Sequence, residues 1–307
     1  MDSLVPLKLL GVGGRSAVWL VERTGQRSSS VTWVTGGDAP PVQLALKVPL
    51  QAPRTAPSLR SGVQELQAML PLIHEHLVRP WGLVTTENGP GLLMDAYPAG
   101  SLARLLRSGH RLSPGEVVTV FSPVAAALEH VHAHGASHGD VSTANILLSS
   151  EGRPVLADLG DAALLGMGAS QAAPEADLAA LAAAAWEALT GRAPEEGSRR
   201  PPLGAVRSDV PAAMVDLLEE ALSPSPPGLS AGQFAVELYD AAAAHPVDLT
   251  DHVDDETLAE LPTRLPASPA PGRFSAALAR LRRRLWGPAL RRVPTVGRFR
   301  RRRQRPS

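Results

Sequence analysis

Three polar residues of the kinds that bind metal ions and phosphates lie close together in the chain: Asp140, Asn145 and Asp158. Asn145 precedes the apolar run 146–148 and Asp158 follows the apolar run 155–157, a pattern typical of buried strands. Mg²⁺ prefers carboxylate and amide oxygens as ligands, and a further carboxylate could orient a hydroxyl nucleophile. The spacing predicts a metal–phosphate site at the ends of two neighbouring strands. The alternative is that Asp140 and Asn145 only cap turns.

Two further features could contact phosphates. The glycine-rich segment 11–18 lies between strand-like runs, so its backbone N–H groups could approach a phosphate with no side chain in the way. Lys47 lies in the alternating segment 43–48 and is one of only two lysines, which suggests a need for a compact ammonium group. Glu65 follows on a helix predicted over residues 61–72. The alternatives are an ordinary hairpin turn, a solubility lysine and a glutamate on an exposed helix face.

The order of these residues resembles the catalytic and metal-binding loops of protein kinases. In that family an Asp, four intervening residues and an Asn precede a strand and an Asp-x-Gly sequence. The form H-G-D-V-S-x-A-N is similar to the actinobacterial branch of the eukaryotic-like serine/threonine protein kinases. The resemblance implies an α+β, bilobal fold with a small β-rich N-terminal lobe and a larger helical C-terminal lobe. It also implies ATP and Mg²⁺ as cofactors, and transfer of the γ-phosphate to a hydroxyl group.

The same resemblance implies a role for each candidate site residue. Asp140 would act as the catalytic base, Asn145 and Asp158 would hold the metal ions, and Glu65 would hold Lys47 against the phosphates. The glycine-rich segment matches the family pattern G-x-G-x-x-G-x-V except that Ser replaces the third Gly. The nucleotide-binding residues implied in this way are Gly11, Gly13, Ser16, Val18, Ala45, Lys47, Met94, Asp95 and Tyr97.

Residues 94–102 resemble the hinge of the family, with Met94 as the gatekeeper and with the Asp95 carbonyl and the Tyr97 amide binding adenine. The Pro-Ala-Gly sequence that follows marks a linker on sequence grounds alone. The predicted organisation is a small lobe over 1–97, a large lobe over 98–245, a flexible linker over 246–272, and a basic amphipathic helix with an Arg-rich tail over 273–307.

Helices are predicted for most of the large lobe. One begins at Ser113, which is followed by Pro and then by Glu at the third helical position, and runs to about residue 134. An Ala-rich helix over 177–189 is apolar nearly all round and hence buried, with Asp177 as its N-cap. Two more helices are predicted over 211–222 and 230–243. The histidines at 130, 132, 134 and 138 favour core and turn positions over a metal site, because a spacing of two does not face one side of a helix.

Four departures from the family pattern concern regulation, catalysis and peptide docking. Position 139 is Gly where the family has an Arg that receives an activation-loop phosphate. Ser142 replaces a catalytic-loop Lys, a kind of loss that can cost roughly 10²–10³ in rate. Asp158 and Asp177 are 19 positions apart, so the activation segment is shortened, and Leu229 replaces the Arg of a P-x-x-R-P turn. The nucleotide machinery is therefore predicted to be whole and the peptide-docking platform to be reduced.

Two other functions stay open on the sequence. One is an ATP-binding pseudokinase scaffold, whose output is contact with a partner. The other is a small-molecule kinase of the aminoglycoside or choline type, which also uses H-G-D and Asn. The hinge, the glycine-rich segment and the spacing to Asp158 fit protein kinases better.

Composition and charge indicate where the protein is located and what its tail could bind. There is no Cys, which excludes disulfides and thiolate metal sites, and no signal peptide or spanning run is visible, so a cytoplasmic location is expected. Residues 271–307 contain 13 Arg and no acid, whereas 1–270 contain 17 basic and 30 acidic residues. We expect this tail to bind an anionic membrane or a nucleic acid, with the inner membrane face favoured by its Leu and Trp residues. The alternatives are that the tail folds back on the acidic body or is merely solvated. A protein substrate or partner is expected but unidentified, and no obligate oligomer is evident.

Overall fold

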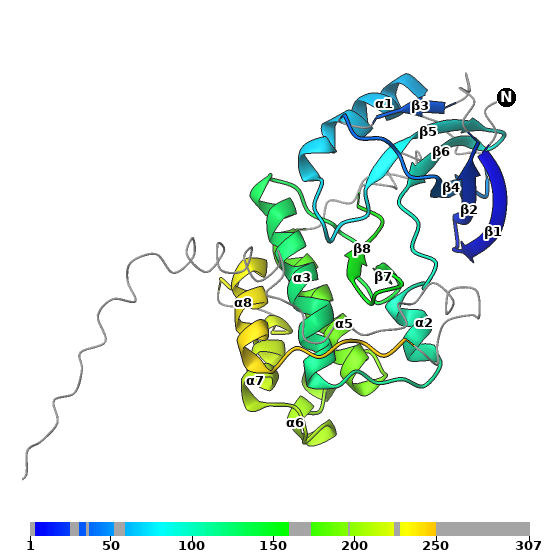
Figure 1. Cartoon of the computed structure of the whole chain (residues 1–307). Helices are drawn as coiled ribbons and strands as arrows, with labels where there is room; N and C mark the ends of the chain where they lie inside the picture. Colours follow the sequence, from blue (N-terminus) through cyan, green and yellow to red (C-terminus); the bar gives the residue numbers. More distant parts are fainter. Residues whose placement is uncertain are drawn as a thin grey trace, which may run out of the picture.

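A computed structural model describes residues 4–24, 31–34, 37–51, 59–159, 173–195, 197–223 and 228–249. Within these residues an antiparallel sheet is followed by a group of helices, with a small hairpin between the two parts (Figure 1). Residues 4–94 are called the small lobe below, and residues 102–249 the large lobe. The predicted α+β fold, with a β-rich lobe before a helical lobe, is confirmed. None of the described helices is long and apolar enough to cross a membrane.

The small lobe is built on one six-stranded sheet. Its strands are β1 (Leu4–Val12), β2 (Ser16–Arg23), β3 (Val31–Trp33), β4 (Gln43–Pro49), β5 (Pro80–Thr86) and β6 (Gly89–Met94). Their order in the sheet is β1-β2-β4-β6-β5-β3, and every neighbouring pair is antiparallel. The short β3 therefore lies at the edge opposite β1, beside β5. Gly82 permits this approach, because a Cβ atom there would lie 2.5 Å from the Thr32 carbonyl oxygen.

One face of this sheet is covered by α1 (Leu59–Ala68), which is followed by the 3-10 turn η1 (Leu70–Leu72). Leu66 of α1 is fully buried and joins a cluster with Ala45, Leu92 and Met94 of the sheet. Burial of one such leucine contributes roughly 1.5–3 kcal/mol. Because side chains alternate along a strand, Leu44 and Leu93 face the other side, where they pack with Trp81.

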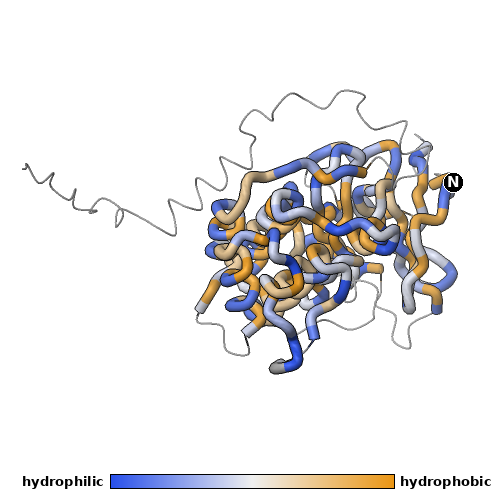
Figure 2. The backbone as a smooth tube through the Cα atoms, turned by 90° about the horizontal axis from the view of Figure 1, so that it is seen from below, coloured by the Kyte–Doolittle hydropathy of each residue, from blue (hydrophilic) through white to orange (hydrophobic). Residues whose placement is uncertain are grey.

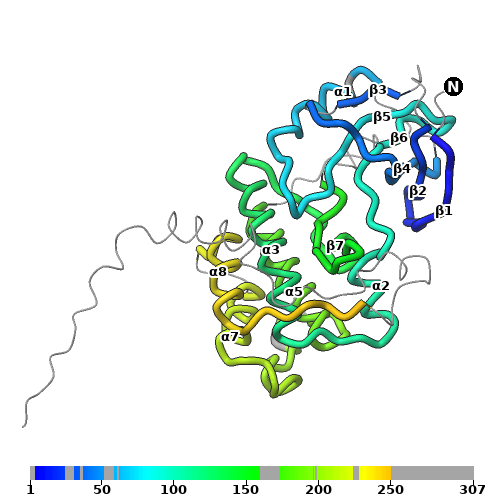
Figure 3. Tube along the Cα trace, in the orientation of Figure 1, coloured from blue at the N-terminus to red at the C-terminus, as the bar shows by residue number. Residues whose placement is uncertain are grey.

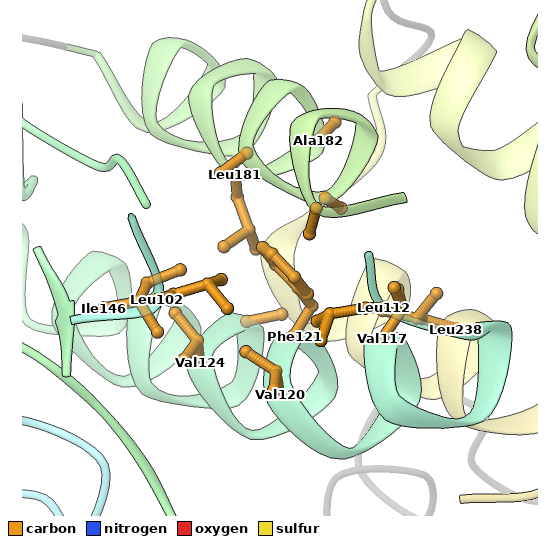
Figure 4. Close-up of a cluster of buried hydrophobic side chains, with 14 of the residues drawn as sticks. Leu102, Leu112, Val117, Val120, Phe121, Val124, Ile146, Leu181, Ala182 and Leu238 are labelled. Carbon is orange, nitrogen blue, oxygen red and sulfur yellow. The ribbon is translucent and has the colours of Figure 1, made fainter. Parts of the chain in front are cut away.

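The large lobe is organised around one long buried helix. Its helices are α2 (Leu102–Arg107), α3 (Pro114–Ala133), α5 (Pro174–Thr190), α6 (Leu203–Val206), α7 (Ala212–Ala221) and α8 (Ala231–Ala241), with the 3-10 turn η2 (Gly197–Arg199). Helix α3 packs against both α5 and α8. Phe121 of α3 is fully buried and points between the helices, toward Leu181 of α5 (Figure 4). Hydrophobic and hydrophilic stretches are interspersed along the coloured part of the trace, which covers the described residues (Figure 2).

The start of α3 confirms the sequence prediction. The Glu116 N–H donates to the Ser113 hydroxyl at 3.4 Å, and the Ser113 N–H donates to the Glu116 carboxylate at 2.8 Å. This reciprocal capping box satisfies two backbone donors that the helix itself cannot pair. The helix ends at Ala133, and Gly135 follows with a φ of 73°.

Two boundaries differ from the sequence predictions. Helix α5 begins at Pro174 with Ala173 as its N-cap, so the assignment of Asp177 as N-cap was wrong, and Asp177 lies inside the first turn. Pro at the first position allowed the helix to start earlier, because Pro lacks the N–H that a helix start leaves unpaired. The chain also stays packed on the large lobe to Leu249, four residues beyond the predicted end at 245 (Figure 3).

Four imidazole rings follow one another across the junction of the lobes. The ring centroids are 5.9 Å apart for His76 and His74, 5.3 Å for His74 and His130, and 4.5 Å for His130 and His134. The His76 N–H donates to Nδ1 of His74 at 3.1 Å, which requires that nitrogen to be unprotonated. Among the described residues, no group of three or more His, Cys, Asp or Glu side chains is arranged to hold a metal ion.

Acidification is expected to loosen this junction. Burial, with smaller contributions from the His76 and His130 rings, lowers the pKa of His74 from 6.5 to about 4. The unfolded chain therefore binds this proton more tightly than the folded protein does. Above the unfolded pKa, His74 does not lower the free energy of unfolding. That free energy decreases as the pH falls from the unfolded pKa toward the folded pKa. Allowing for partial exposure, we expect a loss on the order of 1 kcal/mol between about pH 7 and pH 5.

Urea unfolding at the two pH values measures this effect. His74→Asn keeps an acceptor for the His76 N–H but cannot titrate, and is expected to have a shallower pH dependence. An unchanged slope in His74→Asn would contradict the assignment.

Candidate active site

The predicted metal ligands flank two paired strands, β7 (Ile146–Leu148) and β8 (Pro154–Leu156). Asn145 directly precedes β7, Asp158 lies two residues after β8, and the Ala157 N–H donates to the Asn145 carbonyl at 2.8 Å. The antiparallel pairing therefore brings both side chains to the same end of the hairpin. Asp158 has a φ of 70° and is the only non-glycine residue with positive φ among those that the structure describes. Such conformations are uncommon and cluster at functional sites.

An ion pair joins this hairpin to the small lobe. Nζ of Lys47 lies 2.7 Å from Oδ2 of Asp158, and the two side chains are 7% and 31% exposed. A buried ammonium group needs a paired charge, and the carboxylate from the large lobe supplies it. Two residues that the sequence analysis placed in one site are thus in direct contact.

Asp140 and Asn145 also lie together. Nδ2 of Asn145 donates to the Asp140 carbonyl oxygen at 2.7 Å and to Oδ2 of the Asp140 carboxylate at 3.0 Å. With both amide hydrogens used on Asp140, the acceptor that Asn145 can offer to a cation is its Oδ1 atom. The Asp140 side chain is exposed, so an incoming group can reach it.

A buried carboxylate anchors the loop that carries Asp140. Asp177 of α5 is 1% exposed and accepts hydrogen bonds from His132 Nε2 at 2.9 Å, the His138 N–H at 2.7 Å and the Gly139 N–H at 2.6 Å. Burial alone would raise the pKa of Asp177, but these hydrogen bonds outweigh burial and lower it. Sequence reasoning missed this role, and the available signal was an acid in the first turn of a long apolar helix.

His138 extends the anchor to the end of the hairpin that carries Asn145 and Asp158. It is 3% exposed, donates from Nε2 to the Ala157 carbonyl at 2.8 Å, and accepts at Nδ1 from the Asp140 N–H at 3.3 Å. This pattern requires a neutral ring, in agreement with burial, which lowers the pKa of His138. Gly139 between them has a φ of 77°, a conformation that strains any residue with a Cβ. The backbone geometry thus gives a local reason for Gly where the family has Arg.

The predicted nucleotide-binding residues of the sheet lie on one face. Cross-strand pairing puts Gly11, Val18 and Lys47 in one row and Ala45 beside Met94 in another. The glycine-rich turn closes with a hydrogen bond of 2.8 Å from the Gly13 N–H to the Ser16 carbonyl. A Cβ atom on Gly11 would meet nothing within 4 Å, so the protein itself does not require Gly there and the space is open to a ligand.

The expected hinge follows β6. The Asp95 N–H donates to the Arg79 carbonyl at 3.0 Å, whereas no hydrogen bond between described residues uses the Asp95 carbonyl or the Tyr97 N–H. These are the two groups that the resemblance assigns to adenine. Burial raises the pKa of Tyr97 to about 12, so its phenol is neutral at physiological pH.

Glu65 is the predicted partner of Lys47. It lies partly buried on α1, and Lys47 forms an ion pair with Asp158. The role of Glu65 stays a prediction.

Comparison with known proteins decides the family. Residues 41–195, about half of the chain, match the protein kinase domain family, and this range contains Lys47, Asp140, Asn145 and Asp158. The chain belongs to the protein kinase family. It is similar to two serine/threonine-protein kinases of Streptomyces coelicolor, PkaB and PkaA. PkaB is 34% identical over 129 residues, which are 42% of this chain and 30% of the relative. PkaA is 31% identical over 159 residues, which are 50% and 29%.

A eukaryotic kinase gives a similar match. Mitogen-activated protein kinase kinase kinase 3 of Arabidopsis thaliana is 31% identical over 123 residues, which are 38% of this chain and 19% of the relative. The chain thus spans less than a third of the length of these three relatives.

Three predicted features of this chain lie outside the described residues. They are most of the shortened segment between Asp158 and Asp177, most of the substituted turn before Leu229, and the tail 273–307. All three stay predictions.

Proposed function

We propose that this chain is an ATP- and Mg²⁺-dependent phosphotransferase of the serine/threonine protein kinase type, similar to the actinobacterial branch. The observation that carries the proposal is the contact between Lys47 and Asp158. It brings an ammonium group from the small lobe to a carboxylate from the large lobe, on the same end of the hairpin as Asn145. Membership of the kinase family supports the same function.

The donor set fits a magnesium-bound triphosphate. The Asp158 carboxylate and the Asn145 Oδ1 atom are hard oxygen ligands of the kind that Mg²⁺ takes. Lys47 offers a compact positive charge for phosphate oxygens, and the glycine-rich turn offers backbone N–H groups beside it. When bound, Mg-ATP would supply the phosphoryl group and the cation charge that neutralises the phosphate oxygens.

Asp140 is proposed as the group that accepts the proton of the attacking hydroxyl. Its Oδ2 atom is held by the Asn145 amide at 3.0 Å, so this bond fixes the orientation of the carboxylate. Asp177 fixes the loop that carries Asp140, so Asp140 is already positioned when no substrate is bound. This preorganisation is what general base catalysis needs.

The proposed organisation has the nucleotide between an N-terminal domain of residues 1–97 and a C-terminal domain of residues 98–245. The adenine would bind to the backbone of Asp95 and Tyr97 behind the gatekeeper Met94. Glu65 would hold Lys47 if Asp158 served as a ligand of the cation. The substrate hydroxyl is proposed to belong to a protein, although the substitution at Ser142 and the shortened activation segment weaken this part.

Radiolabelled ATP tests the proposal. The purified full chain is expected to bind Mg-ATP and to transfer label from the γ-position to itself or to a basic protein mixture. Binding without any transfer would favour a pseudokinase scaffold, and transfer only to small hydroxyl compounds would favour a metabolite kinase. Absence of Mg-ATP binding would contradict the proposed function.

A further inference from the structure

A β-bulge in β5 turns one tryptophan toward the hinge. Pro80 pairs with Met94 and Gly82 with Leu93, so Trp81 is an extra residue in this strand. Bulges of this kind re-aim a side chain. The Trp81 indole is 5% exposed, and its Nε1–H donates to Oδ1 of Asp95 at 2.6 Å.

Arg79, two residues before Trp81, contacts the backbone of Asp95. The Asp95 N–H donates to the Arg79 carbonyl at 3.0 Å. The segment 79–81 therefore contacts Asp95 through both its N–H and its carboxylate. Trp81 packs with Leu93 on the face of the sheet opposite Met94, so the Asp95 carboxylate that accepts from its indole lies on that side. Its contact with Trp81 is thus separate from the face that is proposed to receive nucleotide.

The segment 79–81 is tied on its other side to the chain excursion between β2 and β4. The Val34 N–H donates to the Trp81 carbonyl at 2.8 Å. Arg79 forms an ion pair of 2.8 Å with Asp38, and its guanidinium group lies 4.1 Å from the centroid of the Trp81 ring. A continuous set of contacts therefore runs from Asp38, at the outer edge of the small lobe, to Asp95 in the hinge.

The charge on Asp95 makes these contacts important. Burial raises its pKa, while the hydrogen bond from Trp81 and the nearby Arg79 charge act in the opposite direction. A partly buried carboxylate that loses its donor must turn toward water or take up a proton. Turning the carboxylate toward water would move the backbone of residue 95, whose carbonyl is one of the two groups assigned to adenine.

We propose that Trp81 is a positioning residue for nucleotide binding. Its indole N–H fixes Asp95, and the Arg79–Asp38 ion pair extends this control to the outer edge of the small lobe. The inference rests on the proposed function in one respect, namely that the backbone of Asp95 and Tyr97 binds adenine.

Two tryptophan variants test this role. Trp81→Phe removes the indole N–H and keeps an aromatic ring. The matched control is Trp186→Phe in the large lobe, because Trp186 is 3% exposed and also has an arginine, Arg200, 5.6 Å from its ring centroid. We expect Trp81→Phe to weaken Mg-ATP binding by about tenfold. We expect Trp186→Phe to lower the melting temperature by a similar amount and to leave Mg-ATP binding unchanged.

Hydrogen exchange of the nucleotide-free protein separates this inference from the proposed function. In Trp81→Phe the Asp95 N–H is expected to exchange faster than in wild type, and in Trp186→Phe to exchange at the wild-type rate. Asp95→Asn, which keeps an acceptor for the indole, is expected to retain most of the protection. Wild-type exchange in Trp81→Phe, or equal weakening of Mg-ATP binding by both tryptophan variants, would overturn the positioning role. Faster exchange in a protein that binds no Mg-ATP would support the role of Trp81 in positioning Asp95, and would contradict only the proposed function.

Discussion

Replacement of Asp140 by Asn is expected to lower phosphate transfer by about 10²–10⁴-fold, the range that a positioned general base contributes. The physical reason is that an amide cannot accept the proton of the attacking hydroxyl. The change keeps the size of the side chain and leaves a carbonyl oxygen that can accept the Asn145 amide bond. Because Asp140 is exposed, the fold is expected to tolerate the substitution.

Affinity and rate are to be measured on the same preparation. Mg-ATP binding by Asp140→Asn is expected to match wild type, since the proposed cation ligands are Asn145 and Asp158. Asp209→Asn is a matched control, because Asp209 is also exposed but pairs with Arg207 in the large lobe, away from the site. Transfer that survives in Asp140→Asn would rule out Asp140 as the base.

Replacement of Asp177 by Ala is expected to have the largest effect on the fold. The substitution leaves the His132 ring and the backbone N–H groups of His138 and Gly139 without their acceptor. Breaking a buried, charged hydrogen-bond centre typically costs about 3–5 kcal/mol. Chemical denaturation of Asp177→Ala should therefore show a large loss of unfolding free energy, with the loop that carries Asp140 released from α5.

The pH dependence of this anchor follows from its lowered pKa. Since the folded pKa of Asp177 lies below its ordinary value, its stabilisation is full at neutral pH. The stabilisation is lost only as the pH falls through the folded pKa. Glu187→Gln is a control on the same helix, because Glu187 accepts from the Thr143 hydroxyl and Gln keeps an acceptor oxygen. A small stability loss in Asp177→Ala, similar to that of Glu187→Gln, would contradict the anchoring role.

Local signals predicted much of this structure. The apolar runs around Asn145 and Asp158 became β7 and β8, and the Ser113–Glu116 pattern became a capping box. Each of these features depends on neighbours within a few residues, so hydrophobic periodicity and capping chemistry were sufficient. Helix α2 was missed because it is six residues long, too short for a periodic signal.

Contacts between residues far apart in the sequence could not be predicted from such local patterns. Periodicity indicated that the helix containing Asp177 is buried, but not that its carboxylate reaches the backbone of residues 138 and 139. The sequence placed Lys47 and Asp158 in one site but did not indicate the direct ion pair between them. The bulge at Trp81 depends on the register between β5 and β6, which no local pattern encodes.

Calorimetric titration of ATP, with and without Mg²⁺, tests the central claim most directly. The claim is that Lys47, Asn145 and Asp158 surround one metal–triphosphate site. Wild type is expected to bind ATP more tightly when Mg²⁺ is present, and Asp158→Asn is expected to lose that gain. Equal Mg²⁺ dependence in wild type and Asp158→Asn, or no ATP binding by wild type, would contradict the account.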